Sequence, residues 1–173
     1  MIRHFSYFSN MEEIYTAYYE SPLGVIQVKS DTSFIRSILF IDQSGTNDLH
    51  LPAILIDCIN QLGEYFRGEK KDFSFSIKQE GTSFQETVWE NLATIPFGKT
   101  ISYLELARKI GDENSVRAVG NANGRNQLAI VVPCHRVIGS NQQLIGYAGG
   151  LWRKKWLLEH ERKIVSKQLS LFS

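Results

Sequence analysis

A polar connection at residues 78–82 divides this chain into two parts with different expected secondary structure. Before the connection, strand-like segments are followed by one helix, and after it the apolar residues recur at helical spacing. A length of 173 residues is enough for one sizeable domain or two small ones. We therefore predict an N-terminal domain at residues 1–80 and a mostly helical second domain at residues 81–166.

The first part predicts strands followed by a helix. Three strand-like segments are separated by turn residues: 14–20, 24–30 and 34–41. Over residues 52–66 the apolar side chains recur at helical spacing, and Gly68 ends that helix. Phe73, Phe75 and Ile77 alternate with polar residues and predict a further short strand.

The second part predicts helices that begin at capping boxes. Ser83 with Glu86, and Ser102 with Glu105, fit this pattern, in which two side chains satisfy free backbone N–H groups of the first turn. A last amphipathic helix is expected near Leu151–Arg162.

Two short helices joined by a glycine-containing turn form a helix-turn-helix candidate. The first spans Tyr103–Ile110 and stops at Gly111, and Ser115 can cap the second, Val116–Asn123. Gly120 costs the second helix about 1 kcal/mol relative to Ala, so this sequence is not optimised for helix stability. Its small side chains would let the backbone approach either another helix or a nucleic-acid groove, and the pattern alone leaves both open.

The composition argues against several classes of protein. The apolar content of 43% is ordinary for a globular protein, and no apolar run approaches the ~18 residues of a membrane-spanning helix. The chain starts without the apolar segment of a secretory signal. Its two cysteines, Cys58 and Cys134, are far apart and lack zinc spacing, so we expect no metal and a reducing, cytoplasmic location. Cys58 falls on the apolar face of its predicted helix and should lie in the core.

Charge is distributed unevenly along the chain. Residues 1–80 carry 7 Lys or Arg against 11 Asp or Glu, whereas residues 81–173 carry 12 against 7. A basic second half is consistent with binding to a polyanion, although a solvated surface with a chance imbalance would look the same.

The run Pro133-Cys134-His135-Arg136 ends an apolar stretch, Leu128–Val132. A thiolate is a strong nucleophile, and a neighbouring imidazole can take the proton of the thiol. The alternative is a small core cysteine beside an incidental histidine, because adjacent residues on a strand point to opposite faces. By itself the run leaves both interpretations open.

Short motifs of the second part occur in a fixed order: Gly81–Gln85 with Val88-Trp89, Ile95–Gly98 with Ser102-Tyr103, Arg117–Gly120, Arg125-Asn126, Pro133–Val137, Gly146–Gly150 with Lys154, and Trp156–Leu158 with His160-Glu161. Their order and spacing resemble those of the O6-alkylguanine-DNA alkyltransferases, which repair alkylated guanine. The first part agrees more loosely, through Ser21–Gly24 and Tyr65–Gly68. The resemblance implies a small α/β domain of ribonuclease H-like type with an antiparallel sheet, followed by a mostly helical domain that contains the helix-turn-helix.

The resemblance implies transfer of an alkyl group from guanine O6 to the protein's own cysteine. A thioether has no easy hydrolytic exit, so each molecule would act once, and no cofactor is needed. Cys134 matches the nucleophile, His135 its base acting through a bound water, and Glu161 the carboxylate that orients the histidine. Asn126 matches the residue that ties the recognition helix to the active-site segment. Tyr103 matches the phenol that protonates a ring nitrogen of the leaving guanine.

The partner that the resemblance implies is double-stranded DNA carrying O6-alkylguanine. Its target base must leave the stack, and Arg117 matches the arginine that fills the vacated space. Residues expected at the DNA are Arg117, Ala118, Ala122, Arg125, Ser102 and Ser140. Residues expected to wall the guanine pocket are Tyr147, Ala148 and Gly149. Ala148 stands where some relatives have a hydroxyl, so one hydrogen bond to the substrate is expected to be absent.

The C-terminal tail, residues 167–173, is similar to the short peptides by which bacterial proteins dock on the DNA polymerase sliding clamp. Leu171 and Phe172 would fill an apolar pocket of the clamp, beside Leu169, and Gln168 would make polar contacts. The alternative is a terminal segment that folds onto the domain or stays disordered.

Three functions are compatible with these motifs. A single-use alkyltransferase accounts for Cys134, Arg117 and Tyr103 together and is the favoured interpretation. A non-catalytic lesion-binding protein that signals to other repair machinery would not need the thiol. A Cys-His-Glu hydrolase would leave the helix-turn-helix unexplained. The sequence leaves open the size of the alkyl group and activity on O4-alkylthymine, and a monomer is expected because a single-use protein needs no partner subunit.

Overall fold

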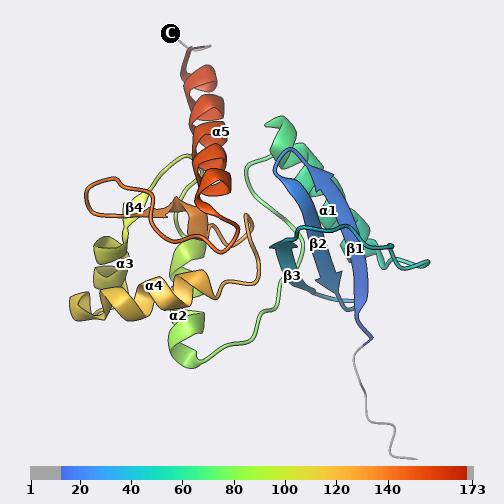
Figure 1. Ribbon diagram of the computed structural model, residues 1–173, viewed down its shortest axis with the longest axis horizontal. Helices are drawn as coiled ribbons and strands as arrows, with labels where there is room; N and C mark the ends of the chain where they lie inside the picture. The colour runs from blue at the N-terminus through green and yellow to red at the C-terminus, as the bar shows by residue number, and fades with distance from the viewer. Residues whose placement is uncertain (1–12, 171–173) are drawn as a thin grey trace, which may run out of the picture.

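Three antiparallel strands and one helix form the N-terminal domain in a computed structural model of the protein, which describes residues 13–170 (Figure 1). The elements are β1 (Tyr15–Ser21), β2 (Gly24–Ser30), β3 (Ile35–Phe40) and α1 (Ala53–Arg67). The strand order is β1-β2-β3. Alternate strand residues point inward and are fully buried with the apolar face of α1: Ala17, Ile26, Val28, Ile35, Ile38, Leu55, Cys58 and Leu62. The predicted strands, helix and core position of Cys58 are confirmed.

Residues 73–77 do not form the strand that their alternation predicts. Only Ile77 makes a bridge, parallel to Ile35 at the edge of β3. The backbone N–H of Ser74 donates instead to the side chain of Gln61, at 3.0 Å, so the ladder cannot continue toward the aromatic residues. Phe73 packs against the ring of Tyr65 at 5.8 Å between centroids. The alternation of apolar and polar residues over 73–77 therefore reflects side-chain packing and not pairing in a sheet.

The second domain is mostly helical, as predicted, and surrounds a small parallel ladder (Figure 1). Its elements are α2 (Ser83–Ala93), β4 (Ile101–Ser102), α3 (Tyr103–Lys109), the 3-10 turn η1 (Glu113–Ser115), α4 (Val116–Gly124), the 3-10 turn η2 (Cys134–Arg136), β5 (Val137–Ile138) and α5 (Leu151–Ser170). Strands β4 and β5 pair with each other, which brings the N-terminus of α3 next to the residues that follow η2.

The capping box of α2 lies one residue earlier than predicted. Thr82 is the N-cap, and its hydroxyl and the side chain of Gln85 exchange hydrogen bonds with each other's backbone. The prediction of Ser83 with Glu86 is therefore wrong by one position, because both adjacent pairs fit the same spacing rule. The capping box of Ser102 at the start of α3 is confirmed.

The helix-turn-helix candidate folds as two short helices, α3 and α4, with Gly111 between them at a φ of +92°. A left-handed φ of this kind favours glycine, which explains why α3 stops there. Ser115 precedes α4, but its hydroxyl donates to the carbonyl of Asp112 and does not cap the helix. Helix α4 is held against α2 by Trp89, whose Nε1–H donates to the carbonyl of Ala122 at 2.9 Å.

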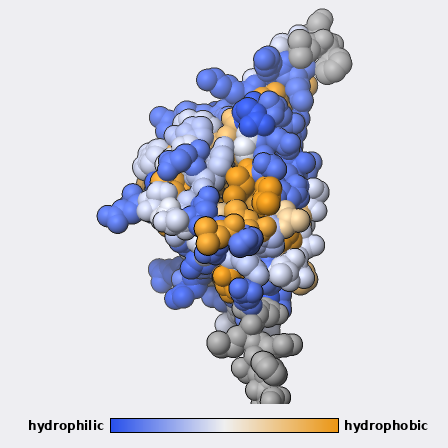
Figure 2. Space-filling view, turned by 90° about the vertical axis from the view of Figure 1, so that its right-hand side faces the viewer, coloured by the Kyte–Doolittle hydropathy of each residue, from blue (hydrophilic) through white to orange (hydrophobic). Residues whose placement is uncertain are grey.

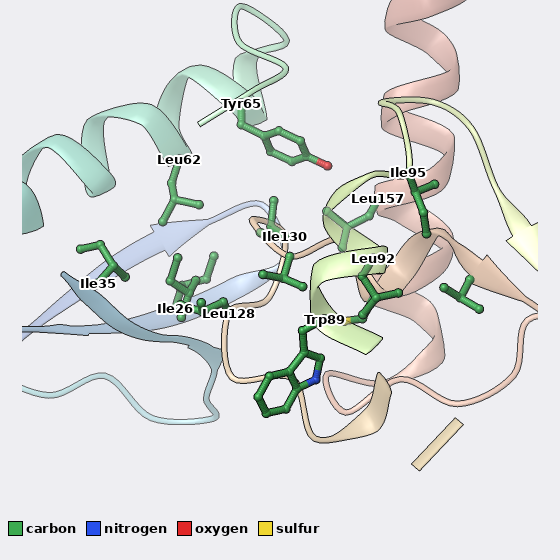
Figure 3. Packing of buried hydrophobic residues seen from close by; sticks show 14 of the residues in the cluster. Ile26, Ile35, Leu62, Tyr65, Trp89, Leu92, Ile95, Leu128, Ile130 and Leu157 are labelled. Atoms are coloured by element: carbon green, nitrogen blue, oxygen red, sulfur yellow. The ribbon is translucent and has the colours of Figure 1, made fainter. Parts of the chain in front are cut away.

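A single hydrophobic core runs through both domains (Figure 3). The connection is made at the free edge of β3, where Ile38 accepts from Ala129 and donates to Gln127 through its backbone. Leu128 and Ile130 are at most 1% exposed and enter the core beside this edge. The segment that leads to Cys134 is therefore fixed to the sheet of the other domain.

Helix α5 extends to Ser170, eight residues beyond the predicted end at Arg162. Its middle contacts α1, where the ring of His160 donates to the carbonyl of Tyr65 at 2.8 Å, and near its end Gln168 accepts from Lys71, which follows α1. These contacts supply the tertiary packing that helices in proteins depend on.

Some large apolar side chains reach the surface. The most exposed in the described residues are Leu49, Leu169, Trp152, Ile145, Ile56, Leu151 and Ile14. Figure 2 shows hydrophobic residues gathered near the middle of one face, with hydrophilic residues around them. Within residues 13–170, no helix combines the length and the apolar character needed to cross a membrane.

Candidate active site

Cys134 lies at the start of η2, after two sharp backbone turns. The first turn is centred on Ile130, where the N–H of Val131 bonds to the carbonyl of Ala129 and φ is +73°. The second is centred on Pro133, where the N–H of Cys134 bonds to the carbonyl of Val132 at 2.8 Å. A positive φ is strained for a β-branched residue and persists only where the surroundings impose it. The buried Ile130 side chain and the sheet contact before it supply that constraint.

Asn126 closes the loop between α4 and the cysteine. Its Nδ2 donates to the carbonyl of Val132 at 2.8 Å, while its Oδ1 accepts from the N–H of Leu128 at 3.0 Å. The side chain is 5% exposed and thus satisfies backbone groups that no water would reach. It thereby joins the segment just after α4 to the residues before Cys134, and its role in tying the two together for the reaction stays a prediction.

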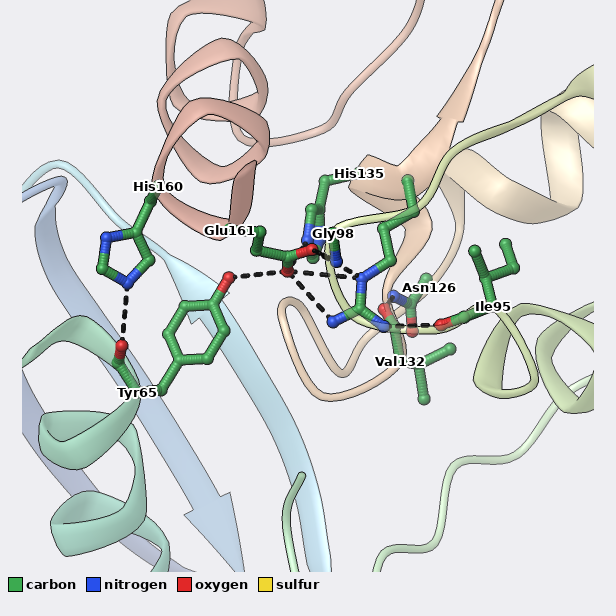
Figure 4. Close-up of polar contacts among 9 residues, drawn as sticks. Tyr65, Ile95, Gly98, Asn126, Val132, His135, His160 and Glu161 are labelled. Carbon is green, nitrogen blue, oxygen red and sulfur yellow. Dashed lines mark hydrogen bonds and ion pairs between the residues drawn. The ribbon is translucent and has the colours of Figure 1, made fainter. Parts of the chain in front are cut away.

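Glu161 of α5 is the centre of a buried polar network that includes His135, the residue after Cys134 (Figure 4). Its Oε1 lies 2.8 Å from Nε2 of His135 and accepts from the hydroxyl of Tyr65 at 2.9 Å. Its Oε2 accepts from Nε of Arg136 at 3.0 Å and from the backbone N–H of Gly98 at 2.8 Å. Both domains therefore contribute donors to one carboxylate.

The charges of this network can be assigned. Burial alone raises the pKa of Glu161, but hydrogen bonds from His135 and Arg136, together with the positive charge of Arg136, overcome that effect and lower the pKa to about 2. Burial lowers the pKa of His135, so the imidazole is neutral. A carboxylate only accepts hydrogen bonds, so Nε2 of His135 carries the ring proton and Nδ1 is the basic nitrogen. Nδ1 is buried and has no partner among residues 13–170.

This charge assignment predicts sensitivity to acid. The pKa of Glu161 is lower in the folded state than its ordinary value of 4.5, so its stabilising contribution is complete above about pH 4.5 and is lost as the pH falls toward 2. The loss is on the order of 3 kcal/mol of unfolding free energy. Urea unfolding at a series of pH values between about 6 and 2 measures it. Glu161→Gln should flatten the pH dependence, and an unchanged slope in that variant would contradict the assignment.

Burial raises the pKa of the Cys134 thiol, while the Asn126 amide, the charge of Lys154 and nearby backbone N–H groups lower it. The net effect raises the pKa of the Cys134 thiol, so the resting thiol is protonated and needs a base to remove its proton. Lys154 is itself buried, which lowers its pKa to about 8, and its Nζ donates to the carbonyls of Ile145 and Gly146. Lys154 therefore holds the loop at Ile145 and Gly146 in place, and its positive charge acts on the sulfur of Cys134.

A cavity of about 150 Å³ opens onto the cysteine. Its lining comes from β3 and the residue after it, from α4 and the segment that follows it, and from the loop before α5: Leu39, Phe40, Ile41, Asn123, Asn126, Ala129, Cys134, Tyr147, Ala148 and Gly149. Tyr103 stands beside it and donates its hydroxyl to the carbonyl of Ile145 at 3.2 Å. Burial raises the pKa of Tyr103 to about 12. The hydroxyl of Tyr147 is buried without a hydrogen-bond partner in the described residues.

The sequence matches two family models that together span most of the chain. Residues 14–79 match the ribonuclease-like domain, and residues 83–163 the DNA binding domain, of 6-O-methylguanine DNA methyltransferase. The methylated-DNA–protein-cysteine methyltransferase of Mycobacterium leprae is 43% identical to it, covering 88% of this chain and 95% of the relative. The chain belongs to the 6-O-methylguanine DNA methyltransferase family. The expected resemblance is confirmed.

Solved structures of the family agree with this fold. The O6-methylguanine methyltransferase of Mycobacterium tuberculosis has a TM-score of 0.82 at 39% identity, covering 93% of this chain and all of that one. The same organism's OGT in complex with DNA has a TM-score of 0.77 at 40% identity, covering 87% and 93% of the two chains. The predicted fold class, an antiparallel N-terminal sheet domain before a helical domain, is thereby confirmed.

The residues that the family resemblance places at DNA do not all face solvent. Arg117, Ala118, Arg125 and Ser140 are exposed. Ser102 is half-buried, and its hydroxyl is used as the N-cap of α3. Ala122 is only 3% exposed and packs in the core, so its methyl group is not on the outer surface. The contact with Trp89 of α2 determines which face of α4 is inward, and the approach of Ala122 to DNA stays a prediction.

The site also contains two residues, Arg136 and Tyr65, to which the sequence analysis gave no role. Arg136 neutralises Glu161, and its NH1 donates to the carbonyl of Ile95 at 2.6 Å. Tyr65 reaches the same carboxylate from the other domain. Arg136 could have been recognised as a buried charge inside an apolar run that needed an anion. Tyr65 gives no local signal, because its partner is 96 residues away.

Proposed function

We propose that this protein repairs DNA by transferring the methyl group of O6-methylguanine to Cys134, once per molecule. The observation that carries the proposal is a buried cysteine that lines a cavity and is followed in the chain by a histidine paired with Glu161. The family membership and the names of the relatives support the same reaction. A non-catalytic lesion binder would have no use for this arrangement of thiol, base and carboxylate.

The proposed reaction is a displacement at carbon. Nδ1 of His135 accepts the thiol proton, through a bound water, and the thiolate sulfur of Cys134 attacks the methyl carbon. A carbon–sulfur bond forms as the carbon–oxygen bond breaks, and its electron pair moves onto guanine O6 and into the ring. Tyr103 gives a proton to a ring nitrogen, so the base leaves neutral. Glu161 stabilises the positive charge that develops on His135. The carbon–sulfur bond of the resulting thioether is not readily hydrolysed, so the thiol is not regenerated and each protein molecule acts once.

The nucleic-acid contacts are proposed from charge and exposure. The target base must leave the duplex to reach a cavity inside the protein. Helix α4 carries Arg117 in its first turn, on the surface, where its side chain can occupy the space that the base vacates. Arg125 and Ser140 are exposed and suited to phosphate contacts, which depend on salt and not on sequence. The cavity walls Tyr147, Ala148 and Gly149 are proposed to contact the guanine.

The proposed function is tested by mass spectrometry of the protein after incubation with an oligonucleotide duplex that contains one O6-methylguanine. We expect the peptide carrying Cys134 to gain the mass of one methyl group, and repaired DNA to equal the protein in moles. Repaired DNA in molar excess, or a methyl group on any other residue, would contradict the proposal.

We also propose that the C-terminal tail docks on the DNA polymerase sliding clamp. Gln168 and Leu169 belong to the last turns of α5 and not to an extended tail, and Gln168 accepts from Lys71. Leu171 and Phe172 lie outside the described residues. Docking would require the end of α5 to unwind and Lys71 to release Gln168. The helical, Lys71-bound form of the tail therefore competes with the clamp-bound form.

Retention of protein variants on immobilised clamp tests the docking of the tail. Removal of residues 168–173 should abolish retention of the protein on immobilised clamp while methyl transfer continues. Lys71→Ala should increase retention, because Gln168 no longer has its partner in the folded helix. Equal retention of the truncated and full-length proteins would refute the docking.

A monomeric state and a cytoplasmic location stay predictions.

A further inference from the structure

We propose that Arg153 is a positioning residue that ties the loop at Tyr147–Gly149 to the N-terminal domain and thereby limits the size of the alkyl group that the site accepts. The inference rests on the proposed function, since this loop walls the cavity beside Cys134. Arg153 lies in the first turn of α5 and is not among the residues that line the cavity. It acts through the wall of the cavity and not by touching the substrate.

The guanidinium of Arg153 bonds to one backbone carbonyl in each domain. Its Nε donates to the carbonyl of Leu23 at 2.8 Å, and its Nη1 donates to the carbonyl of Gly149 at 2.7 Å. Leu23 belongs to the turn between β1 and β2, and Gly149 to the loop before α5. A planar guanidinium holds its donors in a fixed geometry, so the two bonds also fix the position of one carbonyl relative to the other. One side chain thus determines where the loop lies against the N-terminal domain.

The turn between β1 and β2 is a firm attachment point for Arg153. The hydroxyl of Ser21 donates to the carbonyl of Gly24 at 2.6 Å and accepts from the N–H of Leu23 at 3.1 Å. Gly24 has a φ of +95°, which excludes most other residues, and the side chain of Leu23 is fully buried in the core. The sequence analysis named no role for the motif Ser21–Gly24. In the structure this motif presents the carbonyl to which Arg153 attaches the loop.

Arg153 also contacts the strand that meets the loop in the cavity wall. Its guanidinium carbon lies over the ring of Phe40, the last residue of β3, at 4.9 Å from the ring centroid, within the range of a cation–π attraction. A Cβ on Gly149 would lie 3.0 Å from this ring and 2.9 Å from the ring of Tyr147, so the loop and the strand are in direct contact. Phe40 and Gly149 both line the cavity. Arg153 therefore binds both residues of the contact that closes the wall on this side.

The closed wall leaves little room for a bulky alkyl group. The cavity has a volume of about 150 Å³, whereas pockets for small molecules begin at about 300 Å³. A methyl group adds a single carbon between the guanine and the sulfur of Cys134, but a benzyl group adds a whole ring. To admit that ring the loop must move away from Phe40, and this movement breaks the hydrogen bond from Arg153 to Gly149. Arg153 therefore opposes transfer of bulky groups more than transfer of methyl.

The test compares single-turnover rates of transfer to Cys134 from two duplexes, one with O6-methylguanine and one with O6-benzylguanine. Arg153→Met keeps an unbranched side chain but removes the donors and the charge. The ratio of the methyl rate to the benzyl rate should then fall by about tenfold, the lower end of what a pocket gains by excluding an extra group. Arg153→Lys keeps the charge but cannot bridge two carbonyls and should lower the ratio as well. Arg162→Met, at an exposed arginine of the same helix, is the matched control and should keep the wild-type ratio.

The outcomes separate a positioning role from a purely structural or electrostatic one. An arginine that only stabilised the fold, or only attracted DNA by its charge, would change both rates by the same factor. An unchanged ratio in Arg153→Met would therefore overturn the inference, as would benzyl transfer that stays undetectable in this variant. A wild-type ratio in Arg153→Lys would overturn it too, because charge alone would then suffice. The rate from O6-methylguanine reports whether each variant still folds and transfers. Failure of the wild-type protein to methylate Cys134 at all would instead refute the proposed function on which the inference rests.

Discussion

Cys134→Ser is expected to abolish methyl transfer while the protein stays folded. The substitution keeps the shape of a side chain that is 6% exposed, so the packing around the cavity should survive. A serine hydroxyl is far less acidic than a thiol and far less nucleophilic at carbon, and His135 cannot compensate for both deficits. We expect the single-turnover rate to fall by about 10³-fold or more. Loss of the methylated peptide from mass spectra, with an unchanged thermal unfolding midpoint, is the measurement.

The second cysteine of the chain supplies the control for this variant. Cys58 is fully buried in α1, and burial raises the pKa of its thiol, so it is a poor nucleophile with no access to DNA. Cys58→Ala should therefore transfer one methyl group per molecule, as the wild type does, even if it unfolds at a lower temperature. Repaired DNA formed by Cys134→Ser, or lost with Cys58→Ala alone, would mean that the wrong sulfur has been identified.

Features set by neighbouring residues were predictable from the sequence. Helix α1 ends at Gly68 and α3 ends before Gly111, where a positive φ excludes most other residues. The capping box of Ser102 is likewise local. The run at Cys134 and His135 alone left a nucleophile and a core cysteine equally open, and the order of the surrounding motifs favoured the nucleophile. The family resemblance then added Glu161, which lies 26 residues from His135 in the sequence.

Features set by distant contacts were not predictable in the same way. The alternation at residues 73–77 matches a strand, but Gln61 takes the backbone hydrogen bond that the ladder would need. Helix α5 continues past its predicted end, where Lys71 from the segment after α1 donates to Gln168, a contact that no pattern inside α5 reveals. Ala122 is buried because Trp89 of α2 bonds to its carbonyl, a contact that the pattern of α4 does not reveal. In each case a side chain from another element decides the outcome.

The buried network makes Glu161→Gln the most destabilising single change that we predict. A glutamine keeps the volume of Glu161 but leaves the guanidinium of Arg136, which is 6% exposed, without an anion. Removing one partner of a buried ion pair costs about 3–5 kcal/mol, because the other charge stays buried and uncompensated. Transfer should also slow, since the imidazolium that forms on His135 loses its neighbouring negative charge. Urea unfolding and single-turnover rates measure the two effects.

Two further variants separate the ion pair from the helix that carries it. Glu159→Gln, on an exposed part of α5 where the carboxylate lies 3.8 Å from Lys155, should change the unfolding free energy by less than about 1 kcal/mol. Glu161→Gln combined with Arg136→Met removes both buried charges and should recover much of the lost stability without recovering the transfer rate. A double variant no more stable than Glu161→Gln would show that packing around the carboxylate, and not the unpaired guanidinium, causes the loss. Recovery of stability alone would instead assign Glu161 two separable roles, one in neutralising Arg136 and one in orienting His135 toward the thiol.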